Sequence, residues 1–285
     1  MKPAGEPPGR YAVNLRTSRE SQIRDFYREL FRLWGRQHWW PAQSRFEVIV
    51  GAYLTQNTAW TNVERALANL RRVRLLHLNG IRAVPLAELE QLIRPAGYFR
   101  QKAARLKTFI NFLDTRYAGS LDRMFARSTA ELRTELLALN GVGPETADSI
   151  LLYAGGHPVF VVDAYTRRLL ERHRILPQDA RYAEIRLLFE QALSAEEWPV
   201  PGGDRLVGAR QAAQGASHSP SRMSNARRSE LAQVFNEMHG LIVGVAKNYC
   251  LASKALCEQC PLGKFPHKRV RACTRRPRFT GGRET

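Results

Sequence analysis

One carboxylate follows shortly after a glycine-rich turn. Gly141 and Gly143 lie between two stretches of helical pattern, and Asp163 comes after Val161-Val162. Glycines adopt backbone angles that other residues resist, so such a turn lets a backbone approach another molecule closely. Amides at the start of the next helix point outward and suit a phosphate. The turn therefore predicts contact with a nucleic-acid strand without sequence readout, and the alternative is an ordinary helix–turn–helix corner.

A second group of chemically capable residues lies near the end of the chain. The chain has four cysteines, Cys250, Cys257, Cys260 and Cys273, and the first three have C-x6-C-x2-C spacing. The first residues lack the apolar core of a secretory signal, so a reducing compartment is expected, where structural disulfides are rare. The four thiols are therefore interpreted as a metal or cluster site.

The charge of the chain favours a polyanionic partner. The formal net charge is +18, and residues 261–285 carry eight Lys or Arg against one Glu. Such an excess repels itself in the folded state, and its usual use is to neutralise phosphates, which makes binding sensitive to salt. The alternative is a basic protein that is merely soluble. No run approaches the roughly 20 apolar residues of a membrane span, and a cytoplasmic, nucleoid-associated location is expected.

Apolar residues recur at helical spacing along most of the chain, which predicts an all-α fold. Ser128 and Glu131 have the spacing of a capping box at the start of a helix that runs to about residue 139. Pro144 suits the first turn of the next helix, because no backbone donor is needed there. The only β-branched run, residues 158–162, is interpreted as an extended connector. Further helices are expected after about residue 20, at 46–54, 62–72, 87–93 and 100–114, and at about 230–249.

Two kinds of segment depart from this pattern. Residues 1–20 are rich in Pro, Gly and charge and are expected to form a flexible N-terminal tail, and residues 274–285 a basic C-terminal tail. Residues 199–229 are rich in Gly, Ala, Ser, Arg and Gln, with few large apolar side chains. Because such a segment buries too little to offset its ordering entropy, a disordered insertion is predicted there.

These features together resemble the helix-hairpin-helix DNA glycosylase superfamily, the relatives of endonuclease III. The hairpin, Asp163 and the cysteine cluster occur in that family's order, and the resemblance runs from about Trp34 to Cys273. Within the superfamily the chain is most similar to the 3-methyladenine DNA glycosylase III branch. The matching stretches are His38-Trp39-Trp40-Pro41, residues 46–52 with 55–58, residues 94–98 and residues 145–151.

The resemblance implies two α-helical domains that flank a DNA-binding groove. A six-helix domain would span residues 44–157 and contain the helix-hairpin-helix motif at about 130–153. The second domain would combine residues 21–43 with residues 158–273, including the cysteine cluster and the insertion. Double-stranded DNA with a damaged base would lie across the groove, and the protein is expected to act as a monomer.

The resemblance also assigns roles to the two acids near the hairpin. Asp163 occupies the position of the catalytic aspartate, where a fixed carboxylate stabilises positive charge that develops on the sugar and orients or deprotonates a water. The alternative role for Asp163 is that of a helix N-cap or a surface aspartate. Glu145 occupies the position of the lysine by which bifunctional members attack the sugar, and a carboxylate cannot form that Schiff base. A monofunctional enzyme without efficient lyase activity is therefore predicted, with Lys247 as the alternative amine; Glu145 also suits the helix macrodipole.

Aromatic residues of the branch would form the pocket for the flipped base. Trp39, Trp40 and Pro41 match the triplet that lines this pocket, and an electron-poor alkylated purine is attracted to an aromatic face. Core packing is the alternative for these residues. Tyr53 is expected to add to the wall, with Trp60 as the other candidate. Lys247 aligns with a pocket lysine of the branch, and its alternative is a solvated basic face.

DNA contacts are expected at three places. The resemblance places Gln56 in the gap left by the flipped base, where an amide satisfies orphaned base edges; a polar helix end is the alternative. The hairpin would bind the backbone, and a basic loop beside the cysteines would bind further phosphates. The residues concerned are Gly141, Val142, Gly143, Glu145 and Thr146 in the hairpin, and Lys264, Lys268, Arg269 and Arg271 in the loop.

The cysteine spacing matches the superfamily's [4Fe-4S] cluster in part. Twelve residues separate Cys260 from Cys273, where the family has five. The extra residues would loop out without moving the thiolates, or would disrupt the site. The prediction is a structural [4Fe-4S] cluster held by the four cysteines; zinc, no metal, and His267 as the fourth ligand are the alternatives. No nucleotide cofactor is expected.

The sequence as a whole predicts a monofunctional DNA N-glycosylase of base excision repair. It would flip out alkylated purines of the 3-methyladenine type, at a cost of a few kcal/mol for unstacking, and hydrolyse their N-glycosidic bond. The alternatives on the same scaffold are a mismatch thymine or uracil glycosylase and an endonuclease III-like glycosylase with AP lyase activity. The non-enzymatic alternative is a helix-hairpin-helix protein that binds damaged DNA.

Overall fold

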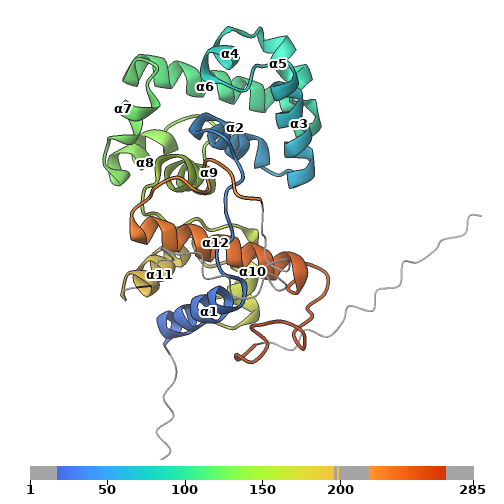
Figure 1. The fold of residues 1–285 in the computed structure, drawn as a ribbon, viewed down its shortest axis with the longest axis vertical. Helices are drawn as coiled ribbons and strands as arrows, with labels where there is room; N and C mark the ends of the chain where they lie inside the picture. Colours follow the sequence, from blue (N-terminus) through green and yellow to red (C-terminus); the bar gives the residue numbers. More distant parts are fainter. Residues whose placement is uncertain (1–17, 196–197, 199–218, 268–285) are drawn as a thin grey trace, which may run out of the picture.

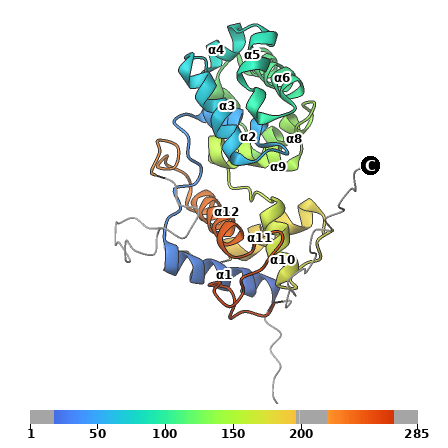
Figure 2. The ribbon, with the colours of Figure 1, turned by 90° about the vertical axis from the view of Figure 1, so that its right-hand side faces the viewer.

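The computed structural model describes residues 18–195, 198 and 219–267, and this part of the chain is helical and contains no named β-strand. The all-α prediction is therefore confirmed. The helices form two lobes joined by a narrow waist (Figures 1 and 2). No helix within the described ranges is long and apolar enough to cross a membrane. The expected tails lie outside the described residues, except that Ser18 caps the first helix, which begins at Arg19.

The first lobe surrounds a helix that is buried on all sides. Every residue from Phe46 to Leu54 in α2 is buried, as expected for a helix without a polar face. The lobe consists of α2 (Arg45–Thr55), α3 (Trp60–Arg72), α4 (Leu78–Ala83), α5 (Leu86–Leu92), η1 (Arg94–Ala96), α6 (Phe99–Tyr117), α7 (Leu121–Phe125), α8 (Thr129–Leu137), α9 (Pro144–Ser149) and the π-helical η2 (Ile150–Gly155).

The second lobe is built around α12 (Glu230–Asn248), whose residues from Ala232 to Ala246 are all buried. It also contains α1 (Arg19–Trp34), α10 (Ala164–Arg172) and α11 (Tyr182–Ser194). Helix α1, from the start of the chain, packs against both α11 and α12. The N-terminal helix therefore joins the C-terminal half of the chain in one lobe (Figure 1).

The expected helix start at residue 128 is confirmed in detail. The Ser128 hydroxyl accepts a hydrogen bond from the Glu131 backbone N–H and donates one to the Glu131 carboxylate at 2.7 Å. This arrangement satisfies backbone donors at the start of α8, which leads into the glycine turn. Pro144 lies at the first position of α9, as its missing donor favours.

An extended connector leads from the first lobe into the second and ends at Asp163. Val159, Phe160, Val161 and Val162 are all buried. Helix α11 holds this connector in place: the Phe160 N–H donates to Glu190 at 3.0 Å and the Val162 N–H donates to the Tyr182 hydroxyl at 3.3 Å. Hydrogen bonds at alternate residues fix the backbone that presents Asp163 to the space between the lobes.

The predicted disordered insertion is wrong for its last part. Residues 199–218 lie outside the described residues, but residues 219–229 include backbone and side-chain contacts to Ala42, just after Trp39 and Trp40. The Met223 N–H donates to the Ala42 carbonyl at 3.0 Å, and the Ser221 hydroxyl accepts from the Ala42 N–H at 3.3 Å. Small polar residues here satisfy backbone groups instead of filling a core, a contribution that composition does not reveal.

Candidate functional site

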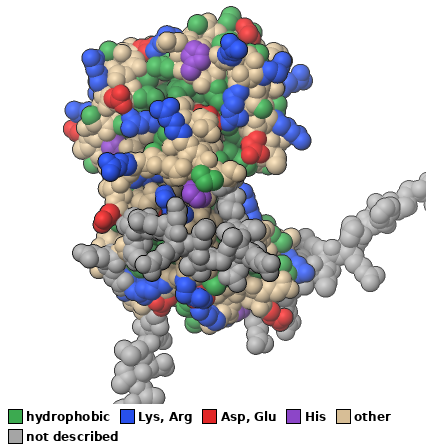
Figure 3. Space-filling model, in the orientation of Figure 1, with side chains coloured by type: hydrophobic (Ala, Val, Ile, Leu, Met, Phe, Trp, Pro, Cys, Tyr) green, Lys and Arg blue, Asp and Glu red, His purple; other side chains and the backbone are tan. Residues whose placement is uncertain are grey.

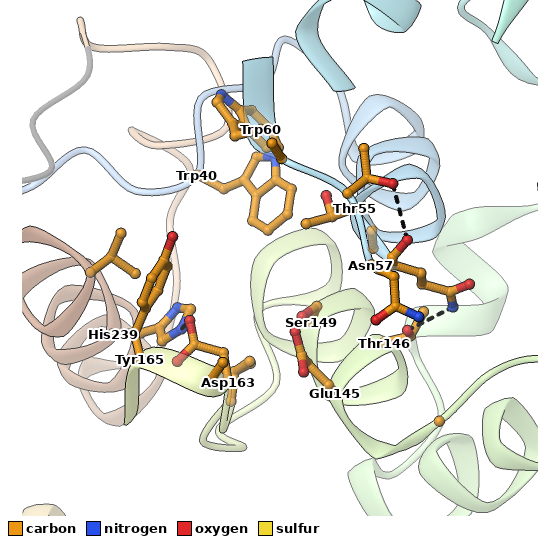
Figure 4. A pocket seen from close by; sticks show the side chains of 18 of the residues that line it. Trp40, Thr55, Asn57, Trp60, Glu145, Thr146, Ser149, Asp163, Tyr165 and His239 are labelled. Carbon is orange, nitrogen blue, oxygen red and sulfur yellow. Dashed lines mark hydrogen bonds and ion pairs between the residues drawn. The ribbon is translucent and has the colours of Figure 1, made fainter. Parts of the chain in front are cut away.

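A cavity of about 570 Å³ lies between the two lobes and is lined by residues of both. Figure 4 shows side chains from the first lobe on one side and Asp163, Tyr165 and His239 on the other. Of the residues singled out in the sequence, the lining contains Trp39, Trp40, Gln56, Gly141, Gly143, Glu145, Thr146, Asp163 and Lys247. Residues more than 200 positions apart in the chain thus meet in one cavity.

Asp163 caps α10 with one carboxylate oxygen and faces the pocket with the other. Its Oδ1 atom accepts from the Thr166 N–H at 2.8 Å and from the Thr166 hydroxyl at 2.9 Å. Its Oδ2 atom lies 3.3 Å from Nε2 of His239 on α12. Burial alone would raise the pKa of Asp163, but His239 and the Thr166 hydrogen bonds outweigh burial and lower the pKa. The carboxylate is therefore ionised at neutral pH, and the N-cap role coexists with a place in the pocket.

Sequence reasoning missed His239 and its second partner, Tyr153 of η2. The two rings stack with centroids 5.8 Å apart, and the Tyr153 hydroxyl is hydrogen bonded to Nδ1 of His239. Both side chains are buried. The only sequence signal is a histidine within an otherwise apolar helical stretch. This signal does not identify Asp163, 76 residues away, as a partner of His239.

Glu145 supplies a second carboxylate to the same pocket. It stands in the first turn of α9, and Figure 4 shows its side chain and that of Asp163 pointing into the cavity. Solvent reaches Glu145 through the cleft, yet the surrounding protein and the Asp163 carboxylate raise its pKa to about 7. Two acids with pKa values displaced in opposite directions therefore share one cavity.

The upper wall of the pocket is aromatic. Trp40 packs edge to face on Trp60, with ring centroids 5.1 Å apart, and lies 5.2 Å from the ring of Tyr153. Trp39 lies edge to face on His239 at 5.7 Å. Tyr165 lines the opposite side. A planar group would meet aromatic faces and edges here, which suits a base.

Two residues expected in this wall are absent from it. Tyr53 is fully buried on α2 and packs on Phe109 of α6, with centroids 6.0 Å apart, so the prediction for Tyr53 is wrong. Its face of α2 turns into the first lobe's core, and Trp60, the other candidate, takes the place by the pocket. Pro41 is outside the lining as well.

Helix α12 fixes the segment that presents the tryptophans. The Asn236 side-chain amide donates to the Trp39 carbonyl at 2.6 Å, and the buried Glu237 carboxylate accepts from the Gln37 N–H at 2.7 Å. Both acceptors and donors are buried, so breaking either contact would leave an unsatisfied polar group. The second lobe therefore positions aromatic residues that contact the first lobe.

The two glycines of the hairpin have different structural surroundings. Gly141 has φ +78°, and a Cβ atom there would lie 2.0 Å from Nε of Arg105. Gly143, by contrast, faces open space, as close approach of another molecule requires. Val142 between them is buried and anchors the turn. Gly143 also caps α9, where its backbone is extended.

Gln56 is held against this hairpin. Its Nε2 atom donates to the Gly141 carbonyl and the Thr146 hydroxyl, each at 2.9 Å, and its Oε1 atom accepts from Arg105 at 2.7 Å. The buried Lys102 ammonium fixes the same loop, because it donates to the Leu54 carbonyl at 2.8 Å and to the Thr58 hydroxyl at 2.6 Å. The loop after α2 is therefore fixed at both ends.

The cysteines line a second, smaller cavity in the second lobe. Cys250, Cys257 and Cys260 surround it together with His173 and His267. An Arg172 N–H donates to Sγ of Cys250 at 3.2 Å. Within the described ranges no three Cys, His, Asp or Glu side chains gather closely enough for a single ion. Cys273, Lys268, Arg269 and Arg271 lie outside the described residues.

Two expected basic contacts have different surroundings. Lys247, in the last turn of α12, is exposed and lies at the edge of the pocket. Lys264 pairs with Glu29 of α1 at 2.8 Å, and its expected phosphate contact stays a prediction. Other Lys and Arg side chains lie on both sides of the waist between the lobes (Figure 3). A polyanion across the waist would meet positive charge on each lobe.

Comparison with known proteins identifies the family. Residues 50–195 match the family model described as HhH-GPD superfamily base excision DNA repair protein. The chain belongs to this superfamily. It is a DNA glycosylase of that family, and DNA is its partner. The expected helix-hairpin-helix relationship is thereby confirmed.

Individual relatives span nearly the whole chain. The "Putative DNA repair glycosylase MJ1434" of Methanocaldococcus jannaschii is 39% identical over 253 residues, 88% of this chain and 98% of that protein. The thymine-DNA glycosylase of Aeropyrum pernix is 25% identical over 82% of this chain and 88% of that protein. The crystal structure of the H. pylori 3-methyladenine DNA glycosylase MagIII bound to 1,N6-ethenoadenine superposes with a TM-score of 0.60 and 26% identity, covering 81% of this chain and 97% of that one.

Proposed function

We propose that this protein is a monofunctional DNA glycosylase that hydrolyses the N-glycosidic bond of alkylated purines of the 3-methyladenine type. The observation that carries the proposal is the pairing, in one cavity, of an ionised Asp163 with an aromatic wall, while a carboxyl group stands at the hairpin position where lyases carry an amine. The MagIII structure with 1,N6-ethenoadenine, a modified adenine, supports a purine in such a pocket.

Asp163 performs the central step. A base must leave the duplex to reach the cavity, and breaking its bond to the sugar develops positive charge on the ring. The ionised carboxylate, held by Thr166 and His239, stabilises that charge and orients the attacking water. Because Asp163 is fixed before the substrate arrives, no reorganisation is needed during the reaction.

The aromatic wall selects the base. Trp40, Trp60 and Tyr165 surround the space above the two carboxylates. An alkylated purine is electron-poor and in some forms cationic, so aromatic faces attract it more than they attract a normal base. Its glycosidic bond is already weakened, and a modest catalytic constellation therefore suffices.

Lyase activity requires an amine at the sugar. Glu145 cannot form a Schiff base, and Lys247 stands at the edge of the cavity, on the last turn of α12. Strand breakage is therefore expected only after alkali. A thymine mismatch glycosylase is the second candidate, because the Aeropyrum pernix relative has that name and similar coverage. Thr55, Asn57 and Ser149 in the lining would then bind the pyrimidine edge.

The donor set of the cysteine cavity suits an iron–sulfur cluster, whose iron atoms are held by thiolates. The side chains of Cys250, Cys257 and Cys260 line one cavity. Cys250, Cys257 and Cys260 would hold a [4Fe-4S] cluster together with Cys273, and His267 is the alternative fourth ligand. The cluster would supply structural cross-linking, since it lies in the second lobe away from the base pocket.

A single-turnover excision assay tests the proposal. Duplexes would carry 3-methyladenine, 7-methylguanine, hypoxanthine, uracil opposite guanine or thymine opposite guanine, each read with and without alkali. Release of the alkylated purines, with strand breakage only after alkali, is the expected result. Release of mismatched thymine alone would favour the second candidate, and release of no base despite tight binding would favour a non-enzymatic DNA-binding role.

A further inference from the structure

His239 lies between the catalytic carboxylate and a tyrosine that does not reach the pocket. Its Nε2 atom is 3.3 Å from Asp163 Oδ2, and its Nδ1 atom is hydrogen bonded to the Tyr153 hydroxyl. Tyr153 has no exposed surface, and the His239 side chain is 5% exposed. The three groups come from η2, α12 and the start of α10, so the contact joins both lobes.

The chemistry of the three groups fixes the direction of the hydrogen bonds. Burial, reinforced by the Asp163 charge, raises the pKa of Tyr153 well above its usual value, so the hydroxyl keeps its proton. The ionised Asp163 carboxylate, whose Oδ2 atom lies 3.3 Å from Nε2 of His239, can only accept a proton. The nitrogen of His239 that faces Asp163 is therefore the one that carries the proton of a neutral imidazole, and the Tyr153 proton remains available for Nδ1 of His239.

The tautomer of His239 follows from this direction. If Nδ1 accepts from Tyr153, a neutral imidazole carries its proton on Nε2, the nitrogen that lies 3.3 Å from Asp163 Oδ2. Asp163 is then held from two sides, because Thr166 donates to its other oxygen. A carboxylate fixed at both oxygens keeps one orientation toward the sugar.

We infer that Tyr153 and His239 form a hydrogen-bond relay that orients the Asp163 carboxylate, with His239 as a positioning residue for the excision reaction. This inference rests on the proposed function of Asp163. It also links base recognition to the chemistry, because Trp39 packs on His239 and Trp40 packs on Tyr153 in the aromatic wall of the pocket.

A double-mutant cycle separates a relay from simple packing. His239→Leu removes the donor to Asp163, and His239→Gln retains a side-chain amide that reaches the same oxygen. Tyr153→Phe removes only the hydroxyl and keeps the ring against Trp40 and His239. The readouts are the single-turnover excision rate at saturating enzyme and, separately, the Kd for the same duplex.

The relay predicts a specific pattern of rates. His239→Leu should lower the rate about 100-fold and Tyr153→Phe about 10-fold, with little change in Kd. Tyr153→Phe should have no further effect in the His239→Leu background, because Tyr153 acts only through His239. His239→Gln should recover most of the lost rate. Additive effects of the two substitutions, or equal loss in the Leu and Gln variants, would overturn the relay.

A spectroscopic measurement makes the inference independent of activity. ¹⁵N NMR of the imidazole in the unliganded protein should show the Nε2–H tautomer, and Tyr153→Phe should change the tautomer balance. An Nδ1–H tautomer in the parent protein would overturn the relay. Failure of the proposed function would look different: the parent protein would release no alkylated purine, and the cycle would be scored on whichever base it does release.

Discussion

The side-chain nitrogen Nε2 of Gln56 lies 2.9 Å from the carbonyl oxygen of Gly141. The residue expected to fill the gap in DNA is thus hydrogen bonded to the glycine turn of the hairpin. Arg105 completes the contact by donating to Oε1 of Gln56. Insertion of Gln56 into a duplex must exchange these hydrogen bonds for contacts to base edges.

Replacing Gln56 should therefore affect both folding and excision. Gln56→Ala leaves the Gly141 carbonyl and the Arg105 guanidinium without their partner, which should lower the free energy of unfolding by about 1 kcal/mol. The Kd for a lesion duplex should rise severalfold, because the orphaned base edges lose a partner. Thermal melting and fluorescence anisotropy measure the two effects. Gln91→Ala, at an exposed position of α5, is the matched control and should change neither; a Gln56→Ala variant with unchanged Kd would exclude the gap-filling role.

The hydrogen bonds of Lys102 predict an effect on the Gln56 loop that can be measured separately from the effect of replacing Gln56. Lys102 donates to the Leu54 carbonyl, the Thr58 hydroxyl and the Ala96 carbonyl, and burial together with nearby Arg105 lowers its pKa to about 8. Lys102→Met should cost about 3 kcal/mol of unfolding free energy, since buried carbonyls lose their donor. It should also slow excision, because the Gln56 loop loosens.

Lys107 provides the control for Lys102. Its ammonium group donates in a similar way to the carbonyls of Ile81, Arg82 and Val84, and Lys107 is outside the pocket lining. Lys107→Met should lower the melting temperature but leave the single-turnover rate unchanged. Equal loss of rate in the two variants would show that general destabilisation, rather than the loop, explains the Lys102 effect.

The raised pKa of Glu145 predicts a pH-dependent gain in stability on its replacement. Burial in the cleft and the Asp163 charge raise its pKa from 4.5 to about 7. Below about pH 4.5 the Glu145 carboxyl group is protonated in both the folded and the unfolded state, so it does not change the free energy of unfolding. Between about pH 4.5 and about pH 7 the unfolded chain releases a proton that the folded protein retains, so Glu145 lowers the free energy of unfolding by an amount that grows with pH. Above about pH 7 this amount is constant.

Glu145→Gln should accordingly raise the melting temperature at about pH 8 and have little effect at about pH 4. Glu131 offers a control of opposite sign, because Ser128 and Arg127 lower its pKa. Glu131→Gln should lose stability at the higher pH and not at the lower. A stability change in Glu145→Gln that does not vary between these pH values would contradict the assigned shift.

The cysteine cavity predicts a defined metal content. Purified protein should contain iron and acid-labile sulfide in equal amounts, about four of each per chain. Cys257→Ser should lose most of both, and Cys273→Ser should behave alike if Cys273 is the fourth ligand. His267→Ala tests the alternative ligand and should retain iron. Zinc in place of iron, or full iron in Cys257→Ser, would contradict the cluster.

Local sequence signals predicted most of the fold. The Ser128 capping box, the buried helix at 46–54 and the extended connector before Asp163 depend on neighbouring residues, so spacing alone revealed them. Asp163 and the hairpin were placed by the family resemblance, and the structure brings both to one cavity.

Contacts between segments that are distant in the sequence could not be predicted from local spacing. Tyr53 and Trp60 flank the same loop, and periodicity does not say which of two aromatic residues turns toward the core. Residues 219–229 look disordered by composition, yet they satisfy backbone groups near Ala42. The pairing of His239 with Asp163 joins two elements that only the packed lobes bring together.

The most direct test of the account compares the parent protein with Asp163→Asn in single-turnover excision of 3-methyladenine from duplex DNA. The substitution keeps an N-cap acceptor for Thr166 but removes the charge that stabilises the sugar. The account predicts base release by the parent, strand breakage only after alkali, and a loss of rate of at least about 1,000-fold in Asp163→Asn with nearly unchanged DNA binding. Undiminished release by Asp163→Asn, or strand breakage by the parent without alkali, would contradict it.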